Sequence, residues 1–269
     1  MSAEDGAHGD EYDLAAARAE EAAYRTEGAA ERRRFVRETL TPTPGEAVVS
    51  VGAGPGFEPL ELAESVGSTG RVVGVDRSRP MTRLARERLS GVSNAAVVAG
   101  DATALPLPDG VADAATAVQV LQYLASPRAA LAEIRRVLHP SGRAVVFLVD
   151  WDTFPVRGTD QSRTERVLTA WRDHCRHPTL GSRLREPASA AGLAVRSVEP
   201  YAVAADEPTD GTFAGHLLDF VAEFAADHGT VDAAEATRWR EDLAAATDRG
   251  EAFVGLTGYC HLLAPASAR

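Results

Sequence analysis

The sequence predicts an α/β protein built on a doubly wound, mostly parallel sheet of seven strands. Three observations support this fold class. Short apolar segments alternate with helical segments between residues 46 and 150. A glycine-rich turn follows the first apolar segment, and aspartates follow the second and third. Apolar strands that alternate with helices are typical of a parallel sheet covered on both faces, and such sheets bind ligands at the carboxyl ends of their strands.

The first element is expected to be a single helix at 11–40, because Ala, Glu and Arg dominate this stretch. The run from Thr41 to Gly45 contains two prolines and a glycine, which stop a helix. We therefore predict an N-terminal helical segment, residues 1–44, and a larger domain, residues 45–269.

Seven strands are then expected from apolar, often β-branched runs at 47–51, 71–75, 95–99, 112–118, 143–149, 193–203 and 253–263. One helix is expected to follow the glycine turn and to end near residue 66. Further helices are expected at about 80–89, 127–138, 161–175, 182–191, 211–227 and 232–248. The residues His-Pro-Ser-Gly at 139–142 predict a turn. Helical insertions are expected at about 155–191 and 205–249, and the helices at 11–40, 161–191 and 211–248 are expected to form a lid over the ligand.

The amino-acid composition narrows the classes of molecule that the protein is expected to bind. The 269 residues carry a formal net charge of −11, with 45% hydrophobic and 25% charged residues, and all 28 basic residues are Arg. These proportions are typical of a globular protein and exclude wholesale disorder. An acidic surplus repels the phosphates of nucleic acid, so we expect no nucleic-acid partner.

No apolar run reaches the roughly 18 to 20 residues that cross a bilayer, so no membrane association is expected. Residues 1–10 are polar and acidic, unlike a secretory signal, and we expect a cytoplasmic protein. Cys175 and Cys260 lie far apart without partners at ligand spacing, so neither a disulfide framework nor a metal site is expected. Nothing in the sequence indicates an oligomeric state.

The glycine-rich turn reads Val51-Gly-Ala-Gly-Pro-Gly-Phe57. Glycines permit a tight turn and let a ligand approach the backbone without a Cβ in the way. A dinucleotide fingerprint would place its last glycine at Phe57, and a Walker loop would need a lysine, which the chain lacks. The turn therefore favours a ligand without a pyrophosphate. The alternative is a strand-to-helix turn whose glycines serve geometry alone.

Two aspartates and a methionine complete the predicted site. Asp76 ends the second strand, where a carboxylate can accept hydrogen bonds from a ribose diol. Its alternative role is a solvated strand end or a helix N-cap. Asp101 and Ala102 follow the third strand, where the carboxylate can accept from an adenine amine and the next backbone N–H can donate to the ring. Met81 offers an apolar face to a purine or, alternatively, packs in the core.

At residues 45–150 the sequence resembles the class I S-adenosylmethionine-dependent methyltransferases, which have a Rossmann-like fold, and most of all the small-molecule group that includes quinone-biosynthesis methyltransferases. The resemblance rests on five motifs in order: Val-Gly-Ala-Gly-Pro-Gly (51–56), Val-Val-Gly-Val-Asp (72–76), Gly-Asp-Ala-Thr-Ala-Leu-Pro (100–106), Val-Gln-Val-Leu-Gln-Tyr (118–123) and Arg-Arg-Val-Leu-His-Pro-Ser-Gly-Arg (135–143). It implies S-adenosylmethionine as cofactor and in-line methyl transfer to a small organic molecule.

The resemblance also implies a role for each matched position. Gly52, Gly54 and Gly56 would pass under the methionine part of the cofactor. Asp76 would hold the ribose, with Arg77 beside it. The remaining positions would bracket the adenine or lie near the sulfonium: Met81, Asp101, Ala102, Val118 and Gln119. The sequence departs from the family at Ser50, where an acidic residue usually supports the charged end of the cofactor.

The class of methyl acceptor is narrowed mainly by motifs that the sequence lacks. No Asn/Asp-Pro-Pro-Tyr/Phe motif follows the fourth strand, which disfavours methylation of a nucleobase or glutamine amine. No catalytic residue is assigned; the candidates for a general base are Tyr123, Asp150, Asp152 and His216. Six aromatic residues either line an apolar pocket or form the core of the lid: Trp151, Phe154, Trp171, Phe213, Phe220 and Phe224.

Two alternative functions stay open. One is a nicotinamide-dependent oxidoreductase, against which the glycine spacing argues. The other is a catalytically inert protein of the same fold that still binds the cofactor, for which Ser50 is the only sequence feature.

Overall fold

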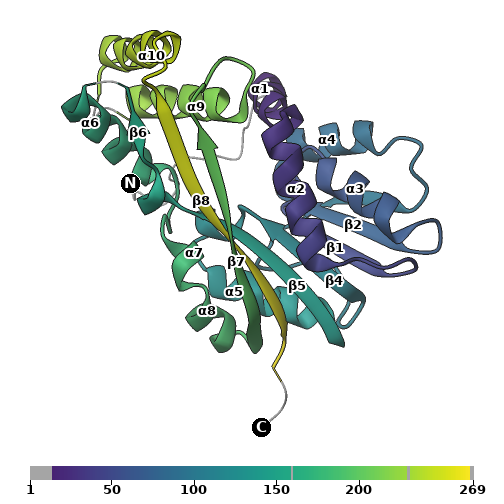
Figure 1. The fold of residues 1–269 in the computed structure, drawn as a ribbon. Helices are drawn as coiled ribbons and strands as arrows, with labels where there is room; N and C mark the ends of the chain where they lie inside the picture. Colours follow the sequence, from purple (N-terminus) through teal and green to yellow (C-terminus); the bar gives the residue numbers. More distant parts are fainter. Residues whose placement is uncertain (1–13, 159, 229–230, 267–269) are drawn as a thin grey trace, which may run out of the picture.

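The computed structural model describes residues 14–158, 160–228 and 231–266 (Figure 1). Its centre is one sheet in the order β3-β2-β1-β4-β5-β8-β6, with β7 also paired to β8. Five strands run parallel: β1 (Ala47–Val51), β2 (Arg71–Asp76), β3 (Ala95–Ala99), β4 (Ala112–Val118) and β5 (Leu138–Asp150). Three are antiparallel to their neighbours: β6 (Val156–Arg157), β7 (Leu193–Ala205) and β8 (Phe253–Pro265). The predicted fold class is confirmed, and β6 adds a two-residue strand to the seven predicted.

Helices cover both faces of the sheet. They are α1 (Leu14–Arg25), α2 (Glu27–Leu40), α3 (Phe57–Val66), α4 (Arg79–Arg88), α5 (Pro127–Val137), α6 (Gln161–Trp171), α7 (Leu180–Arg183), α8 (Arg185–Ala190), α9 (Phe213–Asp227) and α10 (Ala233–Asp248). Short 3₁₀ turns lie at η1 (Leu121–Tyr123), η2 (Trp151–Thr153) and η3 (Arg172–His174). The buried parts of α2 and α3 pack on one face, and those of α5, α7 and α8 on the other.

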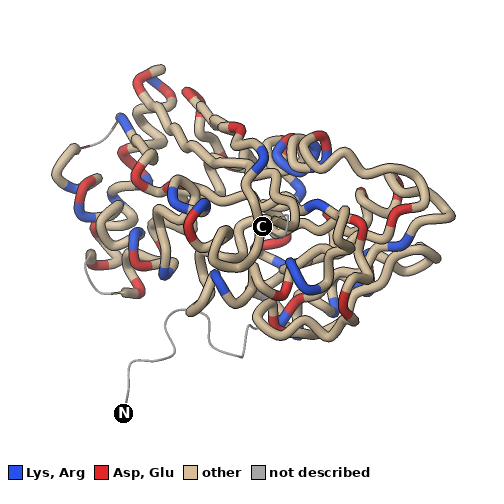
Figure 2. The backbone as a smooth tube through the Cα atoms, turned by 90° about the horizontal axis from the view of Figure 1, so that it is seen from below, with Lys and Arg blue, Asp and Glu red and all other residues tan. Residues whose placement is uncertain are grey.

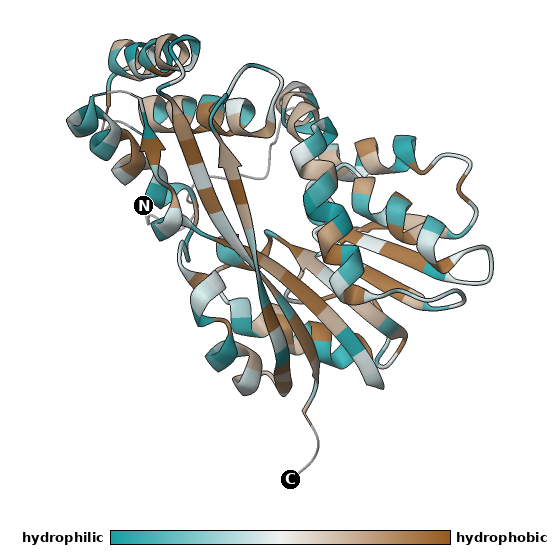
Figure 3. Ribbon diagram, in the orientation of Figure 1, coloured by the Kyte–Doolittle hydropathy of each residue, from teal (hydrophilic) through white to brown (hydrophobic). Residues whose placement is uncertain are grey.

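Alternation along each strand sends successive side chains into these two layers. On β5, Val145 and Phe147 join the α2 and α3 layer, whereas Val146 and Leu148 join the opposite one. Both layers are apolar, which explains why brown predominates along the central strands in Figure 3. Charged residues of both signs are interspersed along the outer elements (Figure 2).

Three helices of the C-terminal half, α6, α9 and α10, gather at one end of the molecule. There α6, α9 and α10 pack on one another, and α9 also contacts α1 and α2, so it lies between α10 and the N-terminal helices (Figure 1). The helices α7 and α8, which the predicted lid includes, instead pack against β5 and β7 beside α5, and both the lid and the division at residue 44 stay predictions. Among the described residues, no helix combines the length and apolarity required to traverse a membrane.

The predicted helix at 11–40 is wrong as a single element. Thr26 takes an extended conformation (φ −62°, ψ 151°), and its hydroxyl accepts a hydrogen bond from Ala29 N, so it caps a new helix and separates α1 from α2. Residues 11–13 lie outside the described residues. The residues on both sides of Thr26 favour a helix, so the composition of the segment gives no sign of the break.

Two smaller expectations also need correction. The predicted turn at 139–142 belongs to β5, where Leu138 pairs with Ala112 and Arg143 with Ala114. Four residues therefore step out of the ladder as a bulge in a longer strand. The helix expected at 182–191 is divided into α7 and α8, which meet at Leu184.

Candidate cofactor site

The glycine turn lies between β1 and α3 and has a left-handed backbone at each glycine. Gly52, Gly54 and Gly56 have φ of 72°, 52° and 87°, a region that costs other residues about 1 to 2 kcal/mol. A side chain at Gly52 would collide with Val120, and a Cβ at Gly56 would lie 2.8 Å from Ala85 Cα. Gly54 is different, because the nearest atom to its absent Cβ is the Tyr24 hydroxyl at 3.6 Å. Gly52 and Gly56 thus allow close packing, whereas the buried Gly54 lies under the Tyr24 ring with ordinary contact room for a Cβ.

Asp76 reaches the turn from the end of β2. Its Oδ2 accepts a hydrogen bond from Gly54 N at 2.8 Å, and its Oδ1 accepts one from Ser78 N at 2.9 Å. Burial raises the pKa of this carboxyl, while the two backbone donors and Arg77 oppose the shift. The N-cap of α4 is Ser78 rather than Asp76. The carboxylate therefore faces the glycine turn, as a ribose-binding role requires.

Asp101 follows β3 beside this site, since Gly100 N donates to Asp76 O at 3.0 Å. Its Oδ1 accepts hydrogen bonds from the amide and the hydroxyl of Thr103, each 2.7 Å long, and these bonds lower its pKa. Arg77 lies on the surface, where its charge opposes the raised pKa of Asp76 and contributes to the lowered pKa of Asp101. The half-buried Ala102 packs against the core beside Asp101.

Val118 and Gln119 end β4 next to the turn, because Val120 contacts Gly52. Gln119 has a φ of 54°, an unusual value for a residue other than glycine, and its N–H donates to Phe147 O at 2.8 Å. Met81 is placed differently from the rest. Its side chain is buried in a small cluster with Ala17 and Leu84, so α1 covers the methionine that was expected to face adenine.

Sequence reasoning missed Tyr24, which reaches the glycine turn from α1. Its ring stacks on Phe57 with centroids 6.3 Å apart, and burial raises its pKa. The Tyr24 hydroxyl lies over Gly54, whose N–H donates to Asp76, and the Asp76 charge adds to the raised pKa of Tyr24. No motif in the local sequence could have revealed this residue, because the contact joins segments far apart in the chain.

Ser50 and Glu58 stand on either side of the turn and touch each other. Glu58 lies in the first turn of α3 and is 7% exposed. Ser50 Oγ donates a 2.9 Å hydrogen bond to Glu58 Oε2, and Oε1 has no hydrogen-bond partner in the described part of the chain. Burial raises the pKa of Glu58, and the hydroxyls of Ser50 and Thr116 oppose this shift. An acid thus lies near position 50, although the strand itself lacks one.

Most of the candidate general bases already make contacts with other residues of the protein. Asp150 Oδ1 accepts from Asp152 N at 3.2 Å, and Asp152 pairs with Arg172. Tyr123 packs edge-on against His174 with ring centroids 5.9 Å apart. His216 lies on α9 and is half-buried. Both thiols are buried, which raises the pKa of Cys175 and of Cys260 to about 12, so neither is a ready nucleophile.

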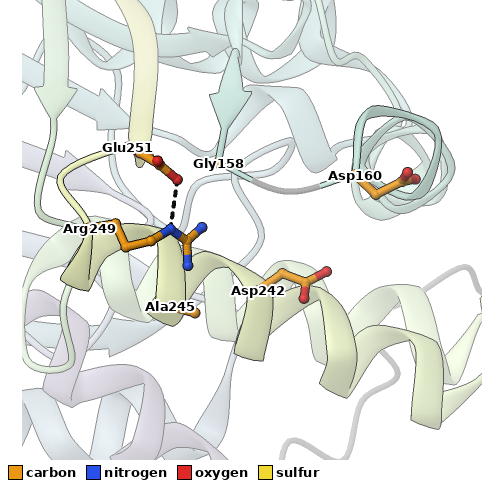
Figure 4. Close-up of a pocket in the computed structure, with 6 residues that line it drawn as sticks. All are labelled: Gly158, Asp160, Asp242, Ala245, Arg249 and Glu251. Atoms are coloured by element: carbon orange, nitrogen blue, oxygen red, sulfur yellow. Dashed lines mark hydrogen bonds and ion pairs between the residues drawn. The ribbon is translucent and has the colours of Figure 1, made fainter.

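Most of the six aromatic residues pack on one another beside α6 and α9. The Trp151 ring lies 5.6 Å from Phe154 and 5.4 Å from Trp171, and Trp171 lies 5.5 Å from Phe224. Phe220 packs against the same layer. Phe213 stands apart at the start of α9, against Gly28. A shallow pocket of about 370 Å³ also lies beside α10, lined by residues such as Asp242 and Arg249 (Figure 4); it involves none of the predicted cofactor residues.

Known proteins match this chain at several levels. A methyltransferase-domain family model matches residues 49–146. A 37.1 kDa protein in transposon TN4556 of Streptomyces fradiae is 35% identical over 243 residues, which cover 87% of this chain and 67% of that protein. The demethylmenaquinone methyltransferase of Corynebacterium kroppenstedtii is 39% identical over 127 residues, 47% of this chain and 52% of the enzyme. The chain thus spans about half the length of that quinone methyltransferase.

The fold has matches among solved structures as well. The YcgJ protein from Bacillus subtilis superposes with a TM-score of 0.61 at 19% identity, covering 89% of this chain and all of that one. Family model, relatives and fold agree with the five sequence motifs and confirm the resemblance that they carry. The chain belongs to the class I S-adenosylmethionine-dependent methyltransferases.

Proposed function

We propose that this protein transfers a methyl group from S-adenosylmethionine to a small organic acceptor. One observation carries the proposal: the Asp76 carboxylate faces the backbone of the glycine turn, through the 2.8 Å hydrogen bond from Gly54 N. This pairing puts an acceptor for ribose hydroxyls beside the backbone of the glycine turn, which Tyr24 of α1 covers. The quinone methyltransferases among the relatives act on small molecules by name, which supports an acceptor of that kind.

The residues present suit this cofactor. Gly54 offers a surface that a Cβ would cover, and Asp76 keeps lone pairs beyond the two that accept from Gly54 and Ser78. Glu58 Oε1 is a buried acceptor without a partner among the described residues, next to the turn that the charged end of the cofactor would cross. A purely structural strand-to-helix turn would not need this orphaned acid.

When bound, S-adenosylmethionine supplies a methyl group on a sulfonium that a nucleophile displaces in line. The remaining task of the protein is to position the two reactants, which lowers the activation barrier by up to about 7 to 11 kcal/mol in favourable cases. The end of β4 is suited to this task, because Gln119 is held in a left-handed conformation by its bond to Phe147 O. Such strained backbone persists where the surroundings fix it, often at functional sites.

Calorimetry with S-adenosylhomocysteine tests the cofactor, and incubation of a metabolite extract with a labelled methyl donor tests the transfer. We expect binding of S-adenosylhomocysteine, no binding of NAD(P), and one labelled small product identified by mass. Binding of NAD(P) without S-adenosylhomocysteine would instead establish the oxidoreductase alternative. Cofactor binding without transfer to any component of the extract would establish the inert alternative.

A further inference from the structure

On α2, the buried Arg32 differs from its neighbour Arg33 in the partners that its charge has among the described residues. Only 7% of its surface is exposed, its Nε has no hydrogen-bond partner, and its guanidinium forms no ion pair with any residue that the structure describes. Its neighbour Arg33 is 6% exposed but donates to Glu61 Oε1 at 2.9 Å and to Tyr24 O at 2.8 Å. A buried arginine stays charged, and the burial of an unpaired charge costs several kcal/mol. The contrast indicates that Arg32 is balanced by something other than the described residues.

Aromatic rings surround this guanidinium. Its Cζ lies 5.2 Å from the centroid of the Phe213 ring and 6.0 Å from that of Phe147. The phenols of Tyr24, Tyr201 and Tyr123 are among the groups that act most strongly on its charge. None of these groups is a carboxylate, and Arg33 adds further positive charge. Burial lowers the pKa of Arg32, as it does for any cation left without compensation.

The position along the sheet favours the acceptor as the missing partner. The predicted adenosine-binding residues Asp76 and Asp101 follow β2 and β3, and β1 and β4 come next in the sheet order. Three of the rings near Arg32, those of Phe147, Tyr201 and Phe213, belong to β5, β7 and α9 on the opposite side of β4 (Figure 1), whereas Tyr24 and Tyr123 belong to α1 and η1. A ligand group held by Arg32 would therefore lie beyond the methyl donor, where an acceptor must approach.

We propose that Arg32 binds an ionised oxygen of the methyl acceptor, either a carboxylate or a deprotonated phenol, attached to an aromatic or otherwise apolar body. This proposal rests on the proposed function. Phe147, Phe213 and Tyr201 would contact the apolar body, while the guanidinium would donate charge-assisted hydrogen bonds to the oxygen. A phenolic acceptor held in this way stays ionised and nucleophilic, so the site would need no separate base.

The first test needs no ligand. Removal of an unpaired buried charge does not weaken a fold, whereas removal of a paired one does. We therefore expect Arg32→Met to unfold thermally at the wild-type temperature or above it, and Arg33→Met to unfold several degrees lower. Equal losses in the two variants would mean that Arg32 is satisfied by the protein itself, and the proposal would be wrong.

The second test uses 2-naphthoate and its neutral counterpart 2-naphthamide, titrated by calorimetry into protein saturated with S-adenosylhomocysteine. We expect the wild type to bind 2-naphthoate about tenfold more tightly than 2-naphthamide. Arg32→Gln should lose this preference and keep its affinity for S-adenosylhomocysteine. Arg34→Gln is the matched control, because Arg34 lies on the same helix with a side chain 61% exposed; it should behave as the wild type.

The outcomes separate the possible sources of the anion. If Arg32→Gln weakens S-adenosylhomocysteine and leaves the naphthoate preference intact, the arginine holds the carboxylate of the cofactor and the acceptor assignment is overturned. A wild type that does not distinguish the two probes overturns it as well. A wild type that binds no S-adenosylhomocysteine contradicts the proposed function instead.

Discussion

Ser50 Oγ donates a 2.9 Å hydrogen bond to Glu58 Oε2, which joins the two ends of the glycine turn. Members of the family usually carry an acid at the position of Ser50, where it supports the charged end of the cofactor. In this chain the acid comes from the first turn of α3 instead, and it reaches the strand through the serine hydroxyl. The departure noted in the sequence therefore has a structural counterpart eight residues later.

We expect Glu58→Gln to weaken the binding of S-adenosylhomocysteine about tenfold, because an amide cannot offset the cationic amino group of the ligand. The double variant Ser50→Asp/Glu58→Ser returns the acid to the strand and should recover most of that affinity. Calorimetry measures both. Glu64→Gln, an exposed position on the same helix, is the control and should change nothing; a Glu58→Gln protein that binds normally would remove Glu58 from the site.

The region from β1 to β5 could be predicted closely because each boundary has a local cause. The glycines fix the turn after β1, Ser78 caps α4, and Ser126 caps α5. The contacts that complete the site could not be predicted in this way. Tyr24 over Gly54 and Arg32 beside Phe213 join segments that only tertiary packing brings together.

Met81 is another residue whose tertiary contacts could not be predicted from the sequence. Its position at the start of α4 was predicted correctly, but the sequence could not show that Ala17 of α1 would cover it. A helix packed on another helix from a distant segment leaves no local signal. The role of Met81 toward adenine thus stays a prediction, as do those of Asp101, Ala102, Val118 and Gln119.

The raised pKa of Asp76 predicts opposite effects of pH on ligand binding and on folding. Ribose hydroxyls donate best to the ionised carboxyl, so affinity for S-adenosylhomocysteine should fall as the pH drops through the raised pKa. The folded protein binds this proton more tightly than the unfolded chain does. The contribution of Asp76 to stability is therefore fully present at low pH and is lost as the pH rises through the raised pKa.

Asp76→Asn isolates this effect. It should weaken the binding of S-adenosylhomocysteine by about 1 to 3 kcal/mol at neutral pH, the cost of losing charge-assisted hydrogen bonds. The difference in unfolding free energy between the wild type and the variant should grow in favour of the wild type on acidification. Titrations by calorimetry and urea unfolding at several pH values measure the two trends; parallel trends would contradict the assignment.

Gly56 should be far less replaceable than a glycine of equal backbone conformation. Gly56 and Gly91 have φ of 87° and 89°, but a Cβ at Gly56 would meet Ala85 Cα at 2.8 Å, whereas nothing lies within 4 Å of one at Gly91. Gly91→Ala should cost about 1 to 2 kcal/mol for the left-handed backbone alone. Gly56→Ala must also displace α4, so its unfolding free energy in urea should fall further. Equal losses of unfolding free energy in the two variants would show that α4 moves aside without cost.

The Glu21–Arg88 ion pair should control how firmly α1 covers the cofactor site. Glu21 is 6% exposed and also accepts from Arg25 Nη2 at 2.9 Å, while Arg88 Nε donates to Pro55 O at 2.8 Å. The pair therefore links α1 to α4 and, through Pro55, to the glycine turn. Loss of the carboxylate leaves Arg88 largely buried with its charge uncompensated, which should lower the free energy of local opening by about 1 to 3 kcal/mol.

Hydrogen exchange read by mass spectrometry tests this expectation. In Glu21→Gln, peptides from residues 14–25 should exchange faster than in the wild type, and saturating S-adenosylhomocysteine should restore part of the protection. Arg18→Gln breaks the other ion pair between the same two helices, Arg18–Glu87, whose side chains are 54% and 48% exposed. Exposed pairs contribute little, so that variant should exchange as the wild type does. If both variants open α1 alike, charge in general rather than the buried pair holds the helix over the site.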